Sequence, residues 1–256
     1  RSTARMTDVS IPTVLALLVR VGEGCEKLHN SVMRDLACTR IECDEIWAYV
    51  SKKQRHVTEA DDLAQVGDTW TWVAIDAVTK LIPAYRVGKR DGENANAFVA
   101  DLASRLRNKV QISTDGLRAY EDAIELAWGG NVDYAQVIKE YEAEPIGPGR
   151  YSPPKVSAIE KRAVAGDPNM DNASTSFVER QNLTMRMQIR RMTRLTNAFS
   201  KKLRNHRAAT ALHFAHYNLA RRHQTLRTTP AMEAGVTDTM WSMEQLLDAA
   251  ITAGVA

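Results

Sequence analysis

Residues 174–202, STSFVERQNLTMRMQIRRMTRLTNAFSKK, limit what this chain can fold into more than any other stretch of it. Side chains suited to burial recur there at spacings of 7, 4, 3 and 4, which places them on one stripe of a helix. They are Val178, Met185, Ile189, Met192 and Thr196. A hydroxyl at Ser174, Thr175 or Ser176 can cap the first turn, because it accepts a backbone N–H that has no partner inside the helix. We therefore predict one long helix with a buried stripe.

The same region is strongly basic. Residues 173–227 contain twelve Lys or Arg and one acid, Glu179, whereas the whole chain has a net charge of only +3, so the remainder is net acidic. A solvated helix face usually interleaves both signs, so this asymmetry favours a polyanionic partner, nucleic acid above all, over solubility alone. A lone carboxylate would repel phosphate, unless a metal ion bridges the two.

Length and composition set the class of protein. With 256 residues, 44% of them hydrophobic, the chain can bury the core of one main domain and a small appendage. Its three cysteines form no CxxC pair and no even set, which favours a reducing, intracellular setting. No apolar run approaches the length of a membrane span.

The middle of the chain changes period between strands and helices. Three strands are predicted at 41–50, 69–78 and 81–88. They are followed by a helix at 94–107, a strand at 110–114, a helix at 117–128 and a strand at 132–139. Three antiparallel strands followed by alternating helices and strands indicate a mixed sheet with helices on its faces.

The two ends and one interruption complete the predicted organisation. Residues 1–24 resemble part of a helix-turn-helix, with a turn at Asp8 and a cap at Ser10, although an ordinary two-helix fragment fits equally. A linker helix is expected at 25–40 and a final helix at about 238–251. Residues 141–173 hold five of the eight prolines, which predicts an inserted loop rather than a helix or a core strand.

Three carboxylates stand out by their places in these elements. Asp44 lies inside the first strand, where an acid is costly without a partner. Asp115 ends a short apolar strand, and Gly116 after it lets a ligand approach the backbone. Glu179 lies in the first turn of the predicted long helix. Three oxygen ligands suit Mg²⁺ or Mn²⁺, and two such ions can promote attack at a phosphodiester. Spacing alone does not single out these three among the 31 acids.

Four segments carry a resemblance to a known family: ECDEIWAYV, STDGLRAY, SFVERQNLTMRMQIRRMTRLTNAFSKK and HFAHYNLARRHQTLRTTPAM. The first three resemble the acidic motifs of bacterial insertion-sequence transposases of the DDE superfamily, most closely the insertion-sequence-one family. The fourth resembles the end of that catalytic domain. The resemblance covers most of residues 35–235, and residues 141–173 separate its second and third motifs more widely than is usual in the family.

This resemblance implies a ribonuclease-H-like α/β fold, a mixed sheet flanked by helices, with a partial N-terminal helix-turn-helix and a C-terminal helical extension. The catalytic domain would span 41–230, followed by a C-terminal helix over 231–256. Asp44, Asp115 and Glu179 would be the catalytic residues and would hold two Mg²⁺ or Mn²⁺ ions. Such enzymes cut double-stranded DNA at transposon ends and join the freed 3′-hydroxyl to target DNA.

The basic residues beside Glu179 are then expected to contact DNA, since phosphate contacts position a duplex without reading its sequence. The expected DNA-binding residues are Asn182, Arg186, Arg190, Arg191, Arg194, Lys201 and Lys202. We expect a homodimer or larger assembly on DNA, no membrane contact, and a place in the bacterial cytoplasm at the nucleoid. Two alternatives stay open: a ribonuclease-H-like nuclease without joining activity, and a transposase-derived DNA-binding protein that no longer catalyses.

Other chemically suggestive residues receive a structural interpretation. Asp76 lies at a strand turn, where Asp is locally favoured. Glu42 and Glu45 flank Asp44, and Glu45 is expected on the opposite face of the strand, so neither is chosen as a metal ligand. His213 and His216 lack companions at ligand spacing and are interpreted as core or DNA-facing.

Overall fold

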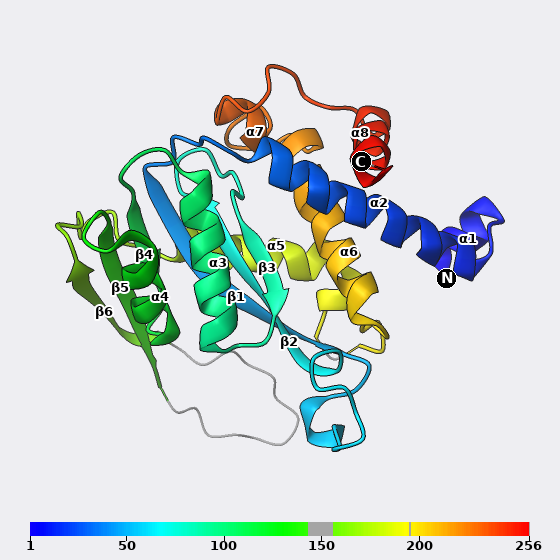
Figure 1. Cartoon of the computed structure of the whole chain (residues 1–256), viewed down its shortest axis with the longest axis horizontal. Coiled ribbons are helices and arrows are strands. Elements are labelled where there is room, and N and C mark those ends of the chain that lie inside the picture. The colour runs from blue at the N-terminus through cyan, green and yellow to red at the C-terminus, as the bar shows by residue number, and fades with distance from the viewer. Residues whose placement is uncertain (143–155, 195, 256) are drawn as a thin grey trace.

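The computed structural model describes residues 1–142, 156–194 and 196–255, and a six-stranded mixed sheet forms its centre (Figure 1). Its strands are β1 (Arg40–Val50), β2 (Gly67–Asp76), β3 (Tyr85–Gly88), β4 (Gln111–Thr114), β5 (Asp133–Tyr141) and β6 (Val156–Ala165). The spatial order is β3-β2-β1-β4-β5-β6. β2 is antiparallel to both β1 and β3, β4 is parallel to β1 and to β5, and β6 is antiparallel to β5.

Helices cover both faces of this sheet. On one face lie α3 (Gly92–Arg105) and α4 (Ala119–Trp128), which contact each other, and on the other face α5 (Ser176–Gln188) contacts β1 and β2 (Figure 1). Each face has its own core, because successive side chains of a strand point to opposite sides. Trp72 is fully buried with Phe98 and Tyr120 on the first face. This architecture is the mixed α/β, ribonuclease-H-like fold predicted from the sequence.

The N-terminal helices join the C-terminal ones. The remaining helical elements are α1 (Ser2–Thr7), α2 (Ile11–Val32), η1 (Gln54–His56), η2 (Arg190–Met192), α6 (Leu203–Ala215), η3 (His216–Ala220), α7 (Pro230–Glu233) and α8 (Met243–Val255). α2 contacts both α6 and α8. Two glycines permit this closeness, because a Cβ at Gly22 would lie 2.3 Å from the Ala208 carbonyl oxygen and one at Gly24 1.9 Å from that of Ala250.

The N-terminal turn has the predicted geometry, but the helix after it is longer than expected. Asp8 adopts a left-handed conformation with φ 53°, and the Ser10 hydroxyl accepts the Thr13 N–H at the start of α2. α2 then continues without a break to Val32. The expected separate linker helix over 25–40 is therefore wrong: its first part belongs to α2 and its last residue begins β1.

The long helix predicted over 174–202 is also wrong in its second half. α5 ends at Gln188, a short 3₁₀ turn follows at Arg190–Met192, and the chain then runs back to the end of β1, where the Ser51 N–H donates to the Ser200 carbonyl at 2.8 Å. Ile189 and Met192 are nevertheless buried beside Val178 and Met185. Four of the five predicted stripe residues are thus buried and Thr196 is half-buried, but a turned chain rather than a straight helix buries them.

The region 141–173 contains a strand. β6 (Val156–Ala165) pairs with β5 along its length and is exposed for most of it. The prediction of an inserted loop is therefore corrected for these ten residues. Pro145, Pro148, Pro153 and Pro154 lie outside the described residues, so only Pro168 of that proline group can be placed.

Candidate functional site

Asp44 lies in the middle of β1, at the centre of the sheet, and its carboxylate points toward α5. Its Oδ2 accepts a hydrogen bond from the Asn182 side-chain amide at 2.8 Å, and its Oδ1 accepts the Glu45 backbone N–H at 2.8 Å. Burial, followed by the negative charges of Glu45 and Asp115, raises the pKa of Asp44 to about 7. A carboxylate held in this way binds a proton readily and would bind a cation in its place.

Asp115 reaches Asp44 because of strand register. The parallel pairing of β1 and β4 matches Cys43 with Thr114. The residues that follow these two are Asp44 and Asp115, which therefore lie side by side. The Asp115 carboxylate accepts the Leu117 N–H at 2.9 Å, which fixes the turn after β4. The topology of the fold therefore brings together two of the three predicted acids.

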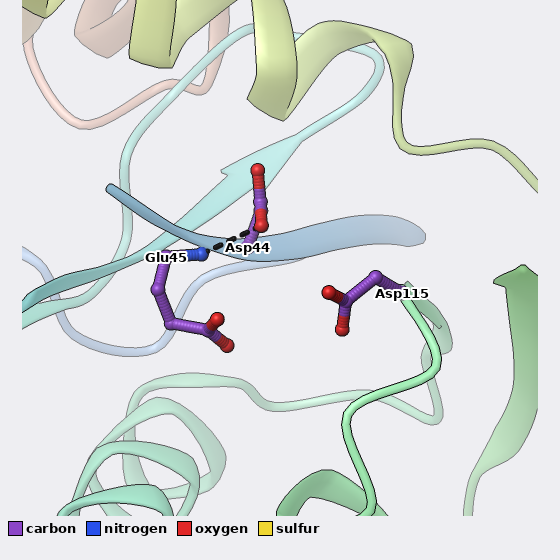
Figure 2. Close-up of side chains that lie close together, drawn as sticks. All are labelled: Asp44, Glu45 and Asp115. Carbon is purple, nitrogen blue, oxygen red and sulfur yellow. Dashed lines mark hydrogen bonds between the residues drawn. The ribbon is translucent and has the colours of Figure 1, made fainter. Parts of the chain in front are cut away.

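Glu45 is the third member of the cluster, and the sequence analysis did not choose it. It does lie on the opposite face of β1 from Asp44, as expected, but Asp115 lies between the two faces at the strand end (Figure 2). One carboxylate oxygen from each of Asp44, Glu45 and Asp115 lies within 4.8 Å of the others. Burial and the charge of Asp115 raise the pKa of Glu45, whereas the Tyr120 hydroxyl and Arg90 lower it. Adjacency to Asp44 was the only signal for it in the sequence.

Glu179 faces the same cleft from the first turn of α5. Asp44, Asp115 and Glu179 all line a cleft of about 600 Å³. Glu179 does not belong to the cluster of three oxygens, because its carboxylate is ion-paired with Lys139 of β5 and accepts a hydrogen bond from the Thr175 hydroxyl at 2.6 Å. The three predicted acids thus line one cleft, and Glu179 lies apart from the oxygen cluster of Asp44, Glu45 and Asp115.

Glu42 has a structural role that fixes the position of α5. Its buried carboxylate accepts the backbone N–H groups of Phe177 and Val178 at 2.7 and 3.1 Å, so β1 caps the start of the helix. Burial raises the pKa of Glu42, while these two N–H groups lower it. A carboxylate at a helix N-terminus satisfies N–H groups that have no partner in the helix. Glu42 thereby positions the turn that carries Glu179.

The cleft also contains cations that the sequence analysis did not select. Arg90, Arg118 and Lys139 line it together with the acids. Arg90 follows β3 and Lys139 lies on β5, far in sequence from the basic stretch after Ala173. No periodicity marks them, so only the folded chain reveals them. A cleft with both carboxylates and cations can take a metal ion and a phosphate group side by side.

The predicted DNA-binding residues are divided among different surroundings. Asn182 contacts Asp44, and Arg186 donates to the backbone carbonyls of Met192 and Trp47 at 2.9 and 3.3 Å, where it holds the chain turn after α5. The remaining residues line two grooves, and the smaller of these lies beside the C-terminal half of β1. Arg190, Arg191, Lys201 and Lys202 line the larger groove, of about 1810 Å³, whose opposite wall is α2.

The smaller groove, of about 380 Å³, is lined by Arg191 and Arg194 together with Trp47 and Tyr49 of β1. The Arg191 guanidinium donates to the Ser200 hydroxyl at 3.3 Å, and burial lowers its pKa. This groove lies beside the C-terminal half of β1, whereas Asp44 lies at the middle of that strand.

The residues interpreted as structural fit that interpretation. The Asp76 carboxylate accepts the Thr79 N–H at 3.0 Å and its hydroxyl at 2.6 Å, which closes the turn after β2. His213 is buried in α6, and burial lowers its pKa to about 4, so the ring is neutral at physiological pH.

The three cysteines are free and buried. Within the described residues, no helix has the length and apolar character needed to cross a membrane.

The donor set of the cleft fits a hard divalent cation. All three clustered ligand atoms are carboxylate oxygens, the type that Mg²⁺ and Mn²⁺ prefer, and no cysteine or histidine joins them among the described residues. The Asn182 Oδ1 atom beside Asp44 is buried without a hydrogen-bond partner. A site that concentrates negative charge and leaves a buried polar atom unsatisfied is suited to binding a cation with its water ligands.

Comparison with known proteins adds little to this geometry. No protein-family model and no curated protein matches the chain. Among solved structures, the chain is similar to a Mos1 transposase paired-end complex with the left transposon end, at 17% sequence identity and a TM-score of 0.25. The match covers 46% of this chain and 41% of that chain, so this chain spans less than half the length of that protein. So distant a likeness says nothing of substrate or reaction.

Proposed function

We propose that this chain is a DDE transposase that cuts DNA at transposon ends and joins the freed 3′-hydroxyl to target DNA with the help of divalent cations. The observation that carries the proposal is the cleft in which Asp44, Asp115 and Glu179, from three separate elements, face one another beside cations. The motif resemblance selects the same three acids. The two grooves lined by the basic residues of 190–202 would supply a surface for the phosphates of duplex DNA.

Asp44, Glu45 and Asp115 would hold the metal. Glu179 would become a further ligand of the metal once its ion pair with Lys139 breaks. When bound, Mg²⁺ or Mn²⁺ supplies the charge that polarises a phosphodiester and lowers the pKa of the attacking group. In the first step the oxygen of a water forms a bond to the phosphorus at the transposon end, and the bond from that phosphorus to the 3′-oxygen breaks. A proton from the water ends on the 3′-oxygen, which is released as a 3′-hydroxyl. In the second step the oxygen of that 3′-hydroxyl forms a bond to the phosphorus of a target phosphodiester, the bond from that phosphorus to the target's own 3′-oxygen breaks, and the proton lost by the attacking hydroxyl balances the target 3′-hydroxyl released.

The organisation of the chain follows the same proposal. Residues 1–24 would contact transposon ends as a partial helix-turn-helix, residues 41–230 would form the catalytic domain, and residues 231–256 would support α2 through α8. Because two DNA ends must be processed together, we propose a homodimer or larger assembly on double-stranded DNA. Arg190, Lys201 and Lys202 would contact phosphates beyond the cut site.

The test compares the wild-type chain with Glu179→Gln on labelled duplexes that carry candidate terminal repeats from the DNA flanking its coding sequence, with Mg²⁺ or Mn²⁺. Glu140→Gln is the matched control, because Glu140 is exposed on β5 next to Lys139 and outside the cleft lining. Joined products that disappear only in Glu179→Gln support the proposal. Cleavage without joining indicates a nuclease, and binding without chemistry indicates a DNA-binding protein; either result contradicts strand transfer.

A further inference from the structure

Arg90 lies in the acidic cleft on a backbone that is fixed at both sides. The Lys89 carbonyl accepts the Trp72 indole N–H at 3.1 Å, and the Asp91 carboxylate accepts the Asn94 N–H at 2.9 Å as the cap of α3. The segment between β3 and α3 is thus tied to the core and to a helix start. The backbone of Arg90 is therefore held in a defined position by contacts on both sides.

The guanidinium itself is held on two sides. Its Nε donates to a carboxylate oxygen of Glu45 at 3.1 Å, and its central carbon lies 5.0 Å from the centre of the Trp70 ring. The Glu45 side chain is only 1% exposed, whereas that of Arg90 is 37% exposed. A buried carboxylate therefore anchors one edge of the guanidinium, an aromatic face supports its plane, and the other edge faces the solvent of the cleft.

That free edge has unused hydrogen-bonding capacity. Nη2 lies 3.8 Å from the Asp115 carboxylate, which is an ion-pair distance too long for a hydrogen bond, and within the described chain Nε alone makes a hydrogen bond. A residue that served only to neutralise the acids would be expected to donate to both. Arg90 instead keeps its two terminal nitrogens available beside the clustered carboxylates of Glu45 and Asp115, in the cleft that Asp44 also lines.

We propose that Arg90 forms a phosphate subsite in the acidic cleft, its terminal N–H groups donating to the non-bridging oxygens of the phosphodiester that the cleft receives. This inference rests on the proposed function, because it takes the substrate to be DNA. The fork of an arginine matches two phosphate oxygens at once, which a lysine ammonium cannot do. Arg90 would orient the phosphate while Glu45, itself beside the metal ligands, holds the arginine in place.

Arg90→Lys separates this role from a simple counter-ion, because it keeps the charge and removes the fork. The probe is a short labelled duplex DNA, measured by fluorescence anisotropy with Ca²⁺ present, and Mn²⁺ binding to the DNA-free protein is measured by calorimetry. We expect Arg90→Lys to keep its melting temperature and its Mn²⁺ affinity within about twofold, and to lose roughly tenfold or more in duplex affinity. Arg107→Lys is the control, because Arg107 pairs with Asp35 at an exposed site outside the cleft lining.

Wild-type duplex affinity in Arg90→Lys would overturn the phosphate subsite, as would an equal loss in Arg107→Lys, which would show that the effect of replacing an arginine by lysine is not specific to the cleft. Arg90→Gln adds a second measurement: removal of the cation should leave Mn²⁺ binding as tight or tighter, because a positive charge beside the acids repels the metal. The proposed function fails separately, by the absence of Mn²⁺-dependent cleavage in the wild-type chain. An affinity loss specific to Arg90→Lys would still support the subsite in that case.

Discussion

Replacing Asp44 with Asn should make the metal-free protein less sensitive to pH. Burial and the charges of Glu45 and Asp115 raise the pKa of Asp44 from its ordinary value of 3.8 to about 7. Because the folded-state pKa lies above the unfolded one, the folded state binds the proton more tightly, so stability is present at low pH and is lost as pH rises toward 7. From about pH 5, which is two units below the folded-state pKa, to about pH 8, the free energy of unfolding should fall by about 3 kcal/mol, at 1.36 kcal/mol per pH unit below that pKa.

The assay is urea unfolding in the presence of a chelator at those two pH values, for the wild type and for Asp44→Asn. The change in unfolding free energy between the two pH values should be smaller in the variant by about 3 kcal/mol, and this double difference cancels the effects of the substitution that do not depend on pH. Asp171→Asn, at an exposed carboxyl, is the control and should follow the wild type. Parallel pH curves for the wild type and Asp44→Asn would refute the reasoning.

Three further predictions concern the basic stretch and the helix packing. Arg190→Ala should weaken duplex binding for all sequences and lower the magnitude of the salt slope by about one, whereas an unchanged slope in a salt titration would exclude phosphate contact. Arg186→Ala should lower the melting temperature, since about 1–3 kcal/mol is lost when the partly buried carbonyls it contacts lose a charged donor, and an unchanged melting curve would contradict that role. Gly24→Ala should destabilise the chain by about 1–3 kcal/mol in urea unfolding, because its Cβ meets the Ala250 carbonyl; Gly92→Ala, with open space around it, is the comparison.

The secondary structure followed the sequence wherever local pattern decides it. The β1 strand, the α3 and α4 helices and the left-handed turn at Asp8 were all predicted, because period and turn chemistry act over a few residues. The third strand was predicted over 81–88 but begins only at Tyr85: the Leu81 and Ala84 carbonyls still accept N–H groups of β2, while Ile82 and Pro83 bond with Asn218 and His29. Element boundaries depended on such partners from elsewhere in the chain.

The sequence indicated three acids that line one cleft, but it did not indicate that Glu45 joins Asp44 and Asp115 or that Glu179 lies apart from them. Motif resemblance selected Asp44, Asp115 and Glu179, and the three line one cleft. Strand alternation correctly placed Glu45 on the other face of β1, yet the alternation rule could not tell that Asp115 would lie where both faces can reach it. The position of Asp115 depends on register between two strands that are about 70 residues apart in sequence, and no local pattern encodes that register.

The sequence by itself determined which side chains are buried and where the charge lies, because burial period and charge are properties of neighbouring residues. Tertiary structure alone decided where the helix after Glu179 ends: the Arg186 guanidinium donates to the Met192 carbonyl and the Ser51 N–H to the Ser200 carbonyl, contacts that a helix continued to residue 202 would not make. It also decided that Arg90, which no motif marks, lies beside the acids. Long-range contacts choose among the local conformations that a sequence permits, and the site is made of those choices.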